Sequence, residues 1–295
     1  MQPLVSIGLP VYNGENYVRE ALDSLLAQSY ENFELIISDN ASTDATGEIC
    51  REYAARDPRI RYDRAAQNKG ASWNFNRVLE LSGGEFFMWA GHDDLWHPDY
   101  ISKCVAALSA DKDAVLCHSE GQPITTEGEA VGEPYIGIVN EGETMRERWR
   151  NTHENWEIHA AIYGVMRTET AKKVAPIETY ASADLILISE IALHGKIIQI
   201  PEILQFKRLA PLEEARYKSP EGMMEYLGAT KINKVWMHRF KVMRKCIAGL
   251  KHSGVSSADT LKMSGDIFLI YLKSQLSVDV KELIKSQLTR FSRKK

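Results

Sequence analysis

The first half of the chain alternates between two hydrophobic periodicities. Apolar runs with strand character occur at Val5–Leu9, Phe33–Ser38, Ile60–Asp63, Glu85–Ala90 and Ala114–His118. Between them, apolar residues recur at helical spacing near 18–26, 42–56, 72–81 and 98–110. Strands separated by single helices are typical of successive βαβ units. The pattern therefore predicts an α/β fold with a mixed, mostly parallel sheet flanked by helices.

The second half of the chain changes character twice. Residues 120–144 are rich in Gly, Glu and Thr and predict a loop or an irregular hairpin near the site. The expected elements that follow are a helix at Glu143–Asn151, a strand at Ile162–Arg167, a helix from Asp184 to Gly195, and strands at Lys196–Ile200 and Ile203–Arg208 divided by Pro201 and Glu202. Beyond Pro211 the pattern predicts three helices, at 220–250, 257–275 and 279–291. We therefore expect a catalytic domain over 1–212 and a helical extension over 213–295.

Polar residues follow three of the predicted strands directly, in the loops Pro10–Asn13, Asp39–Asn40 and His92–Asp94. Sheets of this kind bind ligands at the carboxyl ends of their strands. Each loop also has a purely structural interpretation: a turn made by Asn-Gly, an Asx-turn, and an acidic loop before the helix that Pro98 opens. The three loops together mark the edge of the sheet where we expect the site.

The adjacent carboxylates of Asp93 and Asp94 repel each other unless they are solvated or share a cation. Mg²⁺ and Mn²⁺ prefer such hard oxygen ligands and bridge them to substrate phosphates. Asp184 stands at the start of a predicted helix, where a carboxylate is favourable as a cap but could also serve as a general base. Both interpretations of Asp184 stay open at this point.

Composition narrows the class of protein. The 295 residues, 44% hydrophobic and 26% charged, suit one large α/β domain with an appendage. The sequence contains no GxGxxG, no P-loop, no GxSxG, no paired CxxC and no histidine cluster. It also has no apolar stretch of the roughly 18 residues that a membrane span needs, and its first strand follows without a signal-like segment. We therefore expect a cytoplasmic protein with reduced thiols.

Charge divides the chain into two parts. Residues 1–230 carry 21 Lys and Arg against 36 Asp and Glu, whereas residues 231–295 carry 15 against 4. The acidic body argues against nucleic acid as a ligand, because it would repel phosphates. The basic tail is typical of proteins that contact an anionic membrane, or it is a solvated helix surface.

One predicted tail helix has an apolar stripe among lysines and arginines. The stripe consists of Trp236, Phe240, Met243 and Ile247. A basic amphipathic helix of this kind can lie on a membrane. The alternative is that the stripe packs on the catalytic domain. The tail helices could also pair two copies in a homodimer.

Five segments, in this order, resemble family 2 glycosyltransferases, the inverting group with the GT-A fold. They are VSIGLPVYNGENYVREALDSLLAQSYENFELIISDNASTDAT, then Asn68-Lys69-Gly70 with Asn74 and Asn76, then GGEFFMWAGHDDLWHPDYI, SADLILISEIALHGK and IPEILQFKR. The resemblance covers about residues 3–210. It implies a glycosyltransferase with a nucleotide-diphosphate sugar as donor, a glycan or lipid-linked acceptor, and Mn²⁺ or Mg²⁺ as cofactor.

The resemblance also implies roles for single residues. Asp93 would bind the metal, Asp94 would lie in the donor site, and Asp184 would deprotonate the acceptor hydroxyl. The nucleotide sugar would be held by Pro10, Val11, Tyr12, Asn13, Asp39, Asn68, Asn74 and Arg208, with Asp39 on the base and Arg208 on phosphate.

Three departures from the family pattern leave alternatives open. Gly91 stands where the family often has a further Asp, Ala183 where it often has Glu before the base, and Ala210 where many relatives have His. A degenerate sugar-nucleotide-binding or scaffold protein is therefore one alternative. A sugar nucleotidyltransferase is another, although its class needs a Gly-rich basic loop after the first strand, where this chain has PVYNGEN.

Overall fold

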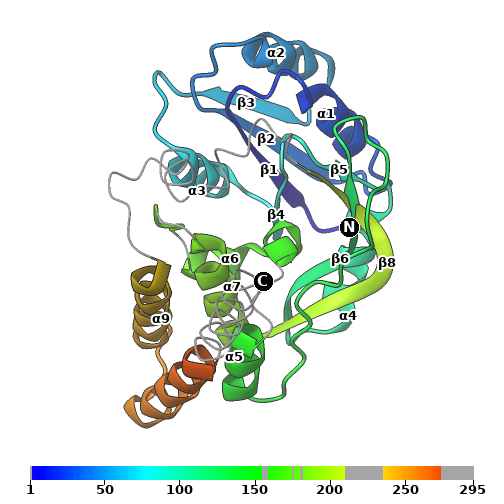
Figure 1. Cartoon of the computed structure of the whole chain (residues 1–295). Coiled ribbons are helices and arrows are strands. Elements are labelled where there is room, and N and C mark those ends of the chain that lie inside the picture. Colours follow the sequence, from blue (N-terminus) through cyan, green and yellow to red (C-terminus); the bar gives the residue numbers. More distant parts are fainter. Residues whose placement is uncertain (1, 155–158, 175, 180–181, 210–234, 274–295) are drawn as a thin grey trace, which may run out of the picture.

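A computed structural model describes residues 2–154, 159–174, 176–179, 182–209 and 235–273 (Figure 1). Its centre is an eight-stranded sheet with the order β3-β2-β1-β4-β7-β6-β8-β5. The order reverses direction along the chain after β3, as it does in doubly wound sheets. The predicted α/β class with a mixed sheet is confirmed.

The first half of the sheet is parallel and built from βα units. Its strands are β1 (Val5–Val11), β2 (Phe33–Asp39), β3 (Ile60–Arg64) and β4 (Phe86–Trp89), connected by α1 (Val18–Leu26), α2 (Thr46–Arg56) and α3 (Ala71–Leu81). In the register of these strands Val11 lies beside Asp39, and Asp39 lies beside Arg64. The ends of three strands thus present their last residues side by side.

The second half of the sheet is mixed. After β5 (Leu95–Trp96) and α4 (Tyr100–Ala110) come β6 (Ala114–Ile124), α5 (Met145–Glu154), the 3₁₀ helix η1 (His159–Tyr163), β7 (Val165–Arg167), α6 (Thr168–Val174), α7 (Ala183–His194) and β8 (Lys196–Arg208). The short β7 runs antiparallel between β4 and β6, and β8 runs parallel to β6. Residues 121–135 return along the end of β6 through bridges at Gly121–Tyr135 and Ile124–Ala130, which is the irregular hairpin expected there.

The predicted division of the last strand was wrong. Lys196–Ile200 and Ile203–Arg208 form one continuous strand, β8, instead of two. Pro201 cannot donate a ladder hydrogen bond, but the pairing with β6 shifts register at Ser119/Glu120 and again at Glu120/Gly121, opposite that position. Such bulges accommodate proline within a strand. The two-residue strand β5 was not predicted, because so short an element has no periodicity.

Helices cover both faces of the sheet (Figure 1). One apolar cluster joins α1, α2 and α4 to the sheet through residues such as Leu22, Cys50 and Tyr100. A second cluster joins α3, α6 and α7 to the opposite face through residues such as Val78, Ala171 and Ile188. The two-layer cover fixes the carboxyl edge of the sheet as the open side where loops gather.

The described C-terminal helices pack on α5 and α7. Helix α9 (Val235–His252) places Val242, Met243, Cys246 and Leu250 in a third cluster with Trp149 of α5 and with α7. Residues 257–273 form a further helix that adds Met263 and Ile267 to that cluster. Of the predicted basic stripe, Met243 is buried and Ile247 half-buried in this contact, whereas the side chains of Trp236 and Phe240 lie outside the described residues. The helix predicted at 279–291 also lies outside them.

Helix α7 has apolar residues on most of its surface, and it is covered by other elements from two directions. Leu187, Ile188 and Ile191 face the sheet, whereas Leu185 and Leu193 face α9. Among the helices that the structure describes, none has the length and apolar character needed to cross a bilayer.

Candidate functional site

The loops after β1, β2 and β4 meet at the carboxyl edge of the sheet. The amide of Asn13 donates to the Ser42 hydroxyl at 3.0 Å, and the amide of Thr43 donates to the Asn13 side-chain oxygen at 2.8 Å. From the other side, the His92 ring packs on Gly14 so closely that a β-carbon there would collide with it. Tyr12 stands out from this loop with 42% of its surface exposed. The predicted convergence of the three loops is therefore present.

Asp39 is fully buried at the end of β2, and both oxygens of its carboxylate accept hydrogen bonds from other residues of the protein. One oxygen accepts from the Ser42 amide at 2.8 Å. The other accepts from the Tyr62 hydroxyl at 2.7 Å and pairs with Arg64. Burial, followed by the hydrogen bond to Asp39, raises the pKa of Tyr62 to about 12, so this hydroxyl stays a donor. Asp39 thus anchors Arg64, whose guanidinium also donates to the Ser42 carbonyl at 2.7 Å.

Arg64 and Tyr62 were not predicted from the sequence. Both lie on β3, and only the pairing of β2 with β3 brings them beside Asp39. A buried carboxylate needs hydrogen-bond donors around it. The burial expected for Asp39 is therefore the one signal in the sequence that points to a basic residue on the neighbouring strand.

The two predicted asparagines occupy different positions. Asn74 is buried in α3, and its side-chain amide donates to the Val11 and Ser38 carbonyls at 3.2 and 2.9 Å. It therefore ties the ends of β1 and β2 together. Asn68 is exposed in the loop after β3, where its side-chain oxygen accepts from Asn40 at 2.9 Å. Asn40 in turn accepts from the Lys69 amide at 2.9 Å, which holds that loop against the loop after β2.

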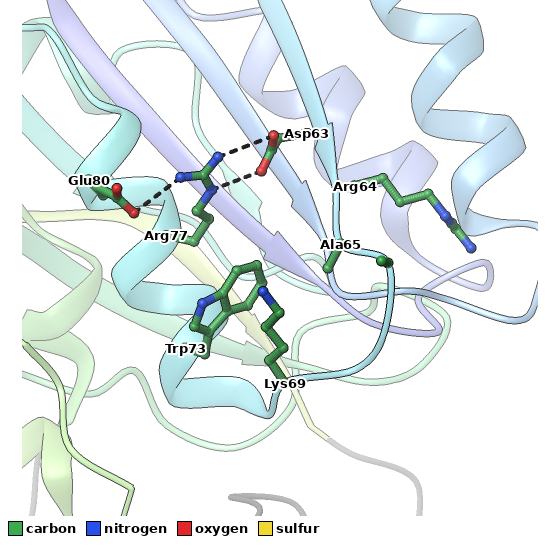
Figure 2. Close-up of a pocket in the computed structure, with 8 residues that line it drawn as sticks. Asp63, Arg64, Ala65, Lys69, Trp73, Arg77 and Glu80 are labelled. Atoms are coloured by element: carbon green, nitrogen blue, oxygen red, sulfur yellow. Dashed lines mark hydrogen bonds and ion pairs between the residues drawn. The ribbon is translucent and has the colours of Figure 1, made fainter.

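A pocket of about 410 Å³ opens beside this loop (Figure 2). It is lined by Asp63, Arg64, Ala65, Ala66, Lys69, Trp73, Arg77 and Glu80. The Lys69 ammonium lies 4.4 Å from the centre of the Trp73 ring, and Arg77 turns toward Asp63 at 2.9 Å and Glu80 at 3.1 Å (Figure 2). The pocket is therefore lined mainly by charged side chains, with Lys69 stacked on the ring of Trp73.

Asp93 and Asp94 converge above Gly91. A β-carbon at Gly91 would lie 3.1 Å from an Asp93 oxygen and 2.9 Å from an Asp94 oxygen, so the missing side chain leaves the space between them open. Burial raises the pKa of Asp94 to about 7, with the Asp93 charge as the second cause, while Lys207 and Arg208 oppose the shift. A divalent cation would offset both the burial of the Asp94 charge and its repulsion by Asp93. The two carboxylates therefore fit a divalent cation as ligands.

This set of donors is small. Within the described part of the chain, no group of three or more His, Cys, Asp and Glu residues is arranged to hold a metal. An ion at Asp93 and Asp94 would therefore need its remaining ligands from water and from the phosphates of a bound substrate, as Mg²⁺ commonly does.

Arg208 ends β8 and holds the acidic loop in place. Its side chain is buried and donates to the Asp93 carbonyl at 2.9 Å, while its amide donates to the Asp94 carboxylate at 3.1 Å. The guanidinium also donates to the Thr126 carbonyl at 2.6 Å and pairs with Glu20 of α1 at 2.6 Å. The structure thus directs this side chain into the protein, where it joins the acidic loop to α1 and the hairpin.

Asp184 lies in the first turn of α7, two residues after Ser182, which has a φ of 66°. The chain just before α7 is fastened to α3. Asn76 exchanges two hydrogen bonds with the backbone of Ile177, at 2.7 and 2.8 Å, and the Ser72 hydroxyl donates to the Glu178 carbonyl at 3.3 Å. Because α3 begins at the carboxyl edge of the sheet, these bonds bring the approach to α7 to the same edge as the other predicted residues.

Solved structures with the same architecture define the fold. The chain superposes on S. aureus TarS residues 1–349 with a TM-score of 0.64 and 18% identity, covering 91% of this chain and 72% of that one. The mannosyltransferase PcManGT from Pyrobaculum calidifontis, solved with GDP-Man and Mn²⁺, superposes with a TM-score of 0.56 and 16% identity over 94% and 81% of the chains. The fold is therefore the GT-A fold of glycosyltransferases, as predicted.

The sequence identifies the family. The profile described as glycosyl transferase family 2 matches residues 6–168, more than half of the chain, so the chain belongs to this family. GlyA of Streptococcus pneumoniae serotype 4 is 39% identical over 97 residues, which are 33% of this chain and 14% of GlyA. A putative glycosyltransferase of Bacillus subtilis, EpsH, is 35% identical over 116 residues, 39% of this chain and 33% of EpsH. The chain thus aligns with a third or less of the length of these two relatives.

Proposed function

We propose that this glycosyltransferase moves a sugar from a nucleotide-diphosphate sugar to a hydroxyl of a glycan or lipid-linked acceptor, with inversion, in the synthesis of a cell-surface polysaccharide. The observation that carries the proposal is the convergence of Asp93 and Asp94 above Gly91, beside the loop Pro10–Asn13. The neighbours support it, since TarS was solved with UDP-GlcNAc and PcManGT with GDP-Man and Mn²⁺.

The acidic loop would hold the diphosphate end of the donor. Asp93 would bind Mn²⁺ or Mg²⁺, with Asp94 beside it in the donor site, and the ion would supply neutralising charge for the departing diphosphate. Arg208 positions the two residues by donating to the backbone carbonyl of Asp93 and to the carboxylate of Asp94. The nucleotide would lie along the Pro10–Asn13 loop toward Asp39 and Asn68.

Asp184 would act as the general base. Its carboxylate would take the proton of the acceptor hydroxyl while the acceptor oxygen forms a bond to the anomeric carbon. At the same time the bond from that carbon to the diphosphate oxygen breaks, and the electron pair leaves with the diphosphate. Direct attack from the opposite face inverts the configuration and needs no covalent enzyme intermediate.

A thermal-shift screen tests the donor site. Nucleotide diphosphates and nucleotide sugars are added to the full chain with and without Mn²⁺, and Asp93→Asn serves as the matched variant. A ligand at 100 times its dissociation constant stabilises the fold by about 2.7 kcal/mol, which gives a measurable shift. We expect a metal-dependent shift with one nucleotide that Asp93→Asn loses. A screen without any shift would contradict the donor site and favour a scaffold that binds no nucleotide.

Replacing Asp184 tests the proposed chemistry separately from binding. We expect Asp184→Asn to lower the rate of sugar transfer by at least about 100-fold, because general-base catalysis contributes roughly 10²–10⁴-fold. The same variant should keep the nucleotide-dependent thermal shift of the unaltered protein. Undiminished turnover by Asp184→Asn would refute its role as the base.

A further inference from the structure

The helix at residues 257–273 exposes an apolar face. Its exposed large side chains are Leu261 at 77%, Phe268 at 52%, Leu269 at 54% and Leu272 at 44%. At 100° per residue these four positions fall on one side of the helix. The opposite side carries Met263 and Ile267, which are buried against α7 and α9. In Figure 1 this helix, drawn in orange, lies at the end of the molecule opposite α2 and β3.

The charges around this face are unevenly placed. Lys262 and Lys273 border the apolar face on one side, and both are exposed. The two acidic residues of the helix are engaged with other groups. Asp266 pairs with Arg146 of α5 at 2.7 Å, and Asp259 accepts from the Ser256 hydroxyl at 2.8 Å and lies 3.5 Å from Lys262. Asp259 is thus balanced by Lys262 and Asp266 by Arg146, and Lys273 gives this border a net positive charge among the described residues.

Charge argues against the chain's own C-terminus as the occupant of this face. Residues 274–295 carry six Lys and Arg against two Asp and Glu, so docking them here would bring like charges together. A second copy of the same face would likewise set lysines against lysines. Four apolar side chains on one helix are also far fewer than the roughly 20–30 residues that each partner contributes to a stable protein interface.

An anionic lipid surface matches both features. Apolar side chains of an amphipathic helix enter the boundary between headgroups and acyl chains, while lysines at its border reach up to the lipid phosphates. The remaining basic residues beyond 230 add attraction to such a surface, which falls off within about a Debye length. The face thus combines the two contributions that hold peripheral proteins on membranes.

We propose that the helix at 257–273 binds the surface of an anionic membrane through Leu261, Phe268, Leu269 and Leu272, with Lys273 at the phosphates. The candidate for membrane contact in the sequence was the stripe at 236–247, but Met243 of that stripe is buried in the protein. This proposal rests on the proposed function only for the role of membrane binding, which would be to hold the enzyme beside a lipid-linked acceptor. Binding itself does not depend on catalysis.

Vesicle flotation with the full chain tests the proposal. The probes are vesicles of phosphatidylcholine alone and of phosphatidylcholine mixed with phosphatidylglycerol. The variant Phe268→Gln/Leu269→Gln removes two apolar side chains from the face, and Ile136→Gln removes an equally exposed one, 59%, from the hairpin as a matched control. We expect the unaltered protein and Ile136→Gln to float with the anionic vesicles, and the double variant to bind at least about tenfold more weakly.

A second variant separates charge from apolar contact. Lys262→Gln/Lys273→Gln should reduce the preference for anionic over neutral vesicles while its fold, measured by circular dichroism, is unchanged. Equal flotation of the apolar double variant and the unaltered protein would overturn the proposal. The proposal would also be overturned if the unaltered protein bound no vesicle and instead formed a dimer, measured by light scattering, that Phe268→Gln/Leu269→Gln abolishes. Since neither variant touches the donor site, the nucleotide-dependent thermal shift reports on the proposed function independently.

Discussion

Arg208 joins three segments of the site that are far apart in the sequence. Its guanidinium contacts the acidic loop, the hairpin after β6 and α1. We predict that Arg208→Gln lowers the free energy of unfolding by about 2–4 kcal/mol, because it leaves buried carbonyls without donors. It should also weaken the metal-dependent nucleotide shift, since the acidic loop loses its support. Chemical denaturation and the thermal-shift screen measure the two effects.

Glu20 provides the matched control for that prediction. It is the ionic partner of Arg208, but its side chain is 55% exposed. Exposed ion pairs contribute about 0–1 kcal/mol, so Glu20→Gln should change stability by no more than that. If both variants were equally destabilised, the ion pair would account for the effect, and the bonds of Arg208 to the backbone would not.

His153 makes the stability of the protein sensitive to acid. Burial lowers its pKa to about 3, and both ring nitrogens are buried without a hydrogen-bond partner among the described residues. Above pH 6.5 the ring is neutral in both states. Below it, the unfolded chain binds a proton that the folded chain refuses until about pH 3, so stability falls by about 1.4 kcal/mol per pH unit.

Replacing this ring should therefore reduce the acid sensitivity. His153 packs edge-on against Trp149 with ring centres 4.5 Å apart, a contact that Phe can reproduce. We predict that His153→Phe loses about 2 kcal/mol less than the unaltered protein between pH 7 and pH 5. Denaturant titrations at the two pH values measure the difference. An unchanged pH dependence in this variant would show that other groups cause the acid sensitivity.

At the scale of elements, the two C-terminal helices differ in what their leucines contact. Leu250 of α9 is fully buried against α7 and α5, whereas Leu261 of the next helix is 77% exposed. We predict that Leu250→Ala lowers the free energy of unfolding by about 2–5 kcal/mol, the usual cost of a core cavity. The same substitution at Leu261 should stay within about 0.5 kcal/mol. Denaturation curves with similar losses for both would contradict the packing of α9 on the domain.

The elements that the sequence predicted well are those with a local signal. The βαβ units from β1 to α4 follow from periodicity within 10 to 20 residues, and the structure confirms their order and type. The continuity of β8 through Pro201 depends instead on how β6 pairs with it, which no local pattern contains. The same holds for the site: the strand-end loops were predictable, but the contact of Arg64 with Asp39 arises from the pairing of β2 with β3.

At the scale of the whole molecule, the acidic and basic parts of the chain share one apolar cluster. Leu185 and Leu193 of α7 lie in the predicted catalytic domain, and Val242 and Leu250 of α9 lie in the predicted extension. The boundary at 212 and 213 stays a prediction about the sequence, but this packing gives it a thermodynamic consequence. A fragment that ends at 212 would expose the face of α7 that α9 covers.

We therefore predict that the fragment 1–212 unfolds at a lower denaturant concentration than the full chain and binds a dye that reports exposed apolar surface. Burying apolar area contributes about 25 cal/mol per Å², so uncovering several large side chains costs several kcal/mol. Introducing Leu185→Gln/Leu193→Gln into the fragment should reduce dye binding without recovering stability. A fragment as stable as the full chain would mean that α7 needs no cover. Deleting the tail would then be a clean test of its membrane binding, whereas under the packing seen here only surface variants such as Phe268→Gln/Leu269→Gln can separate binding from folding.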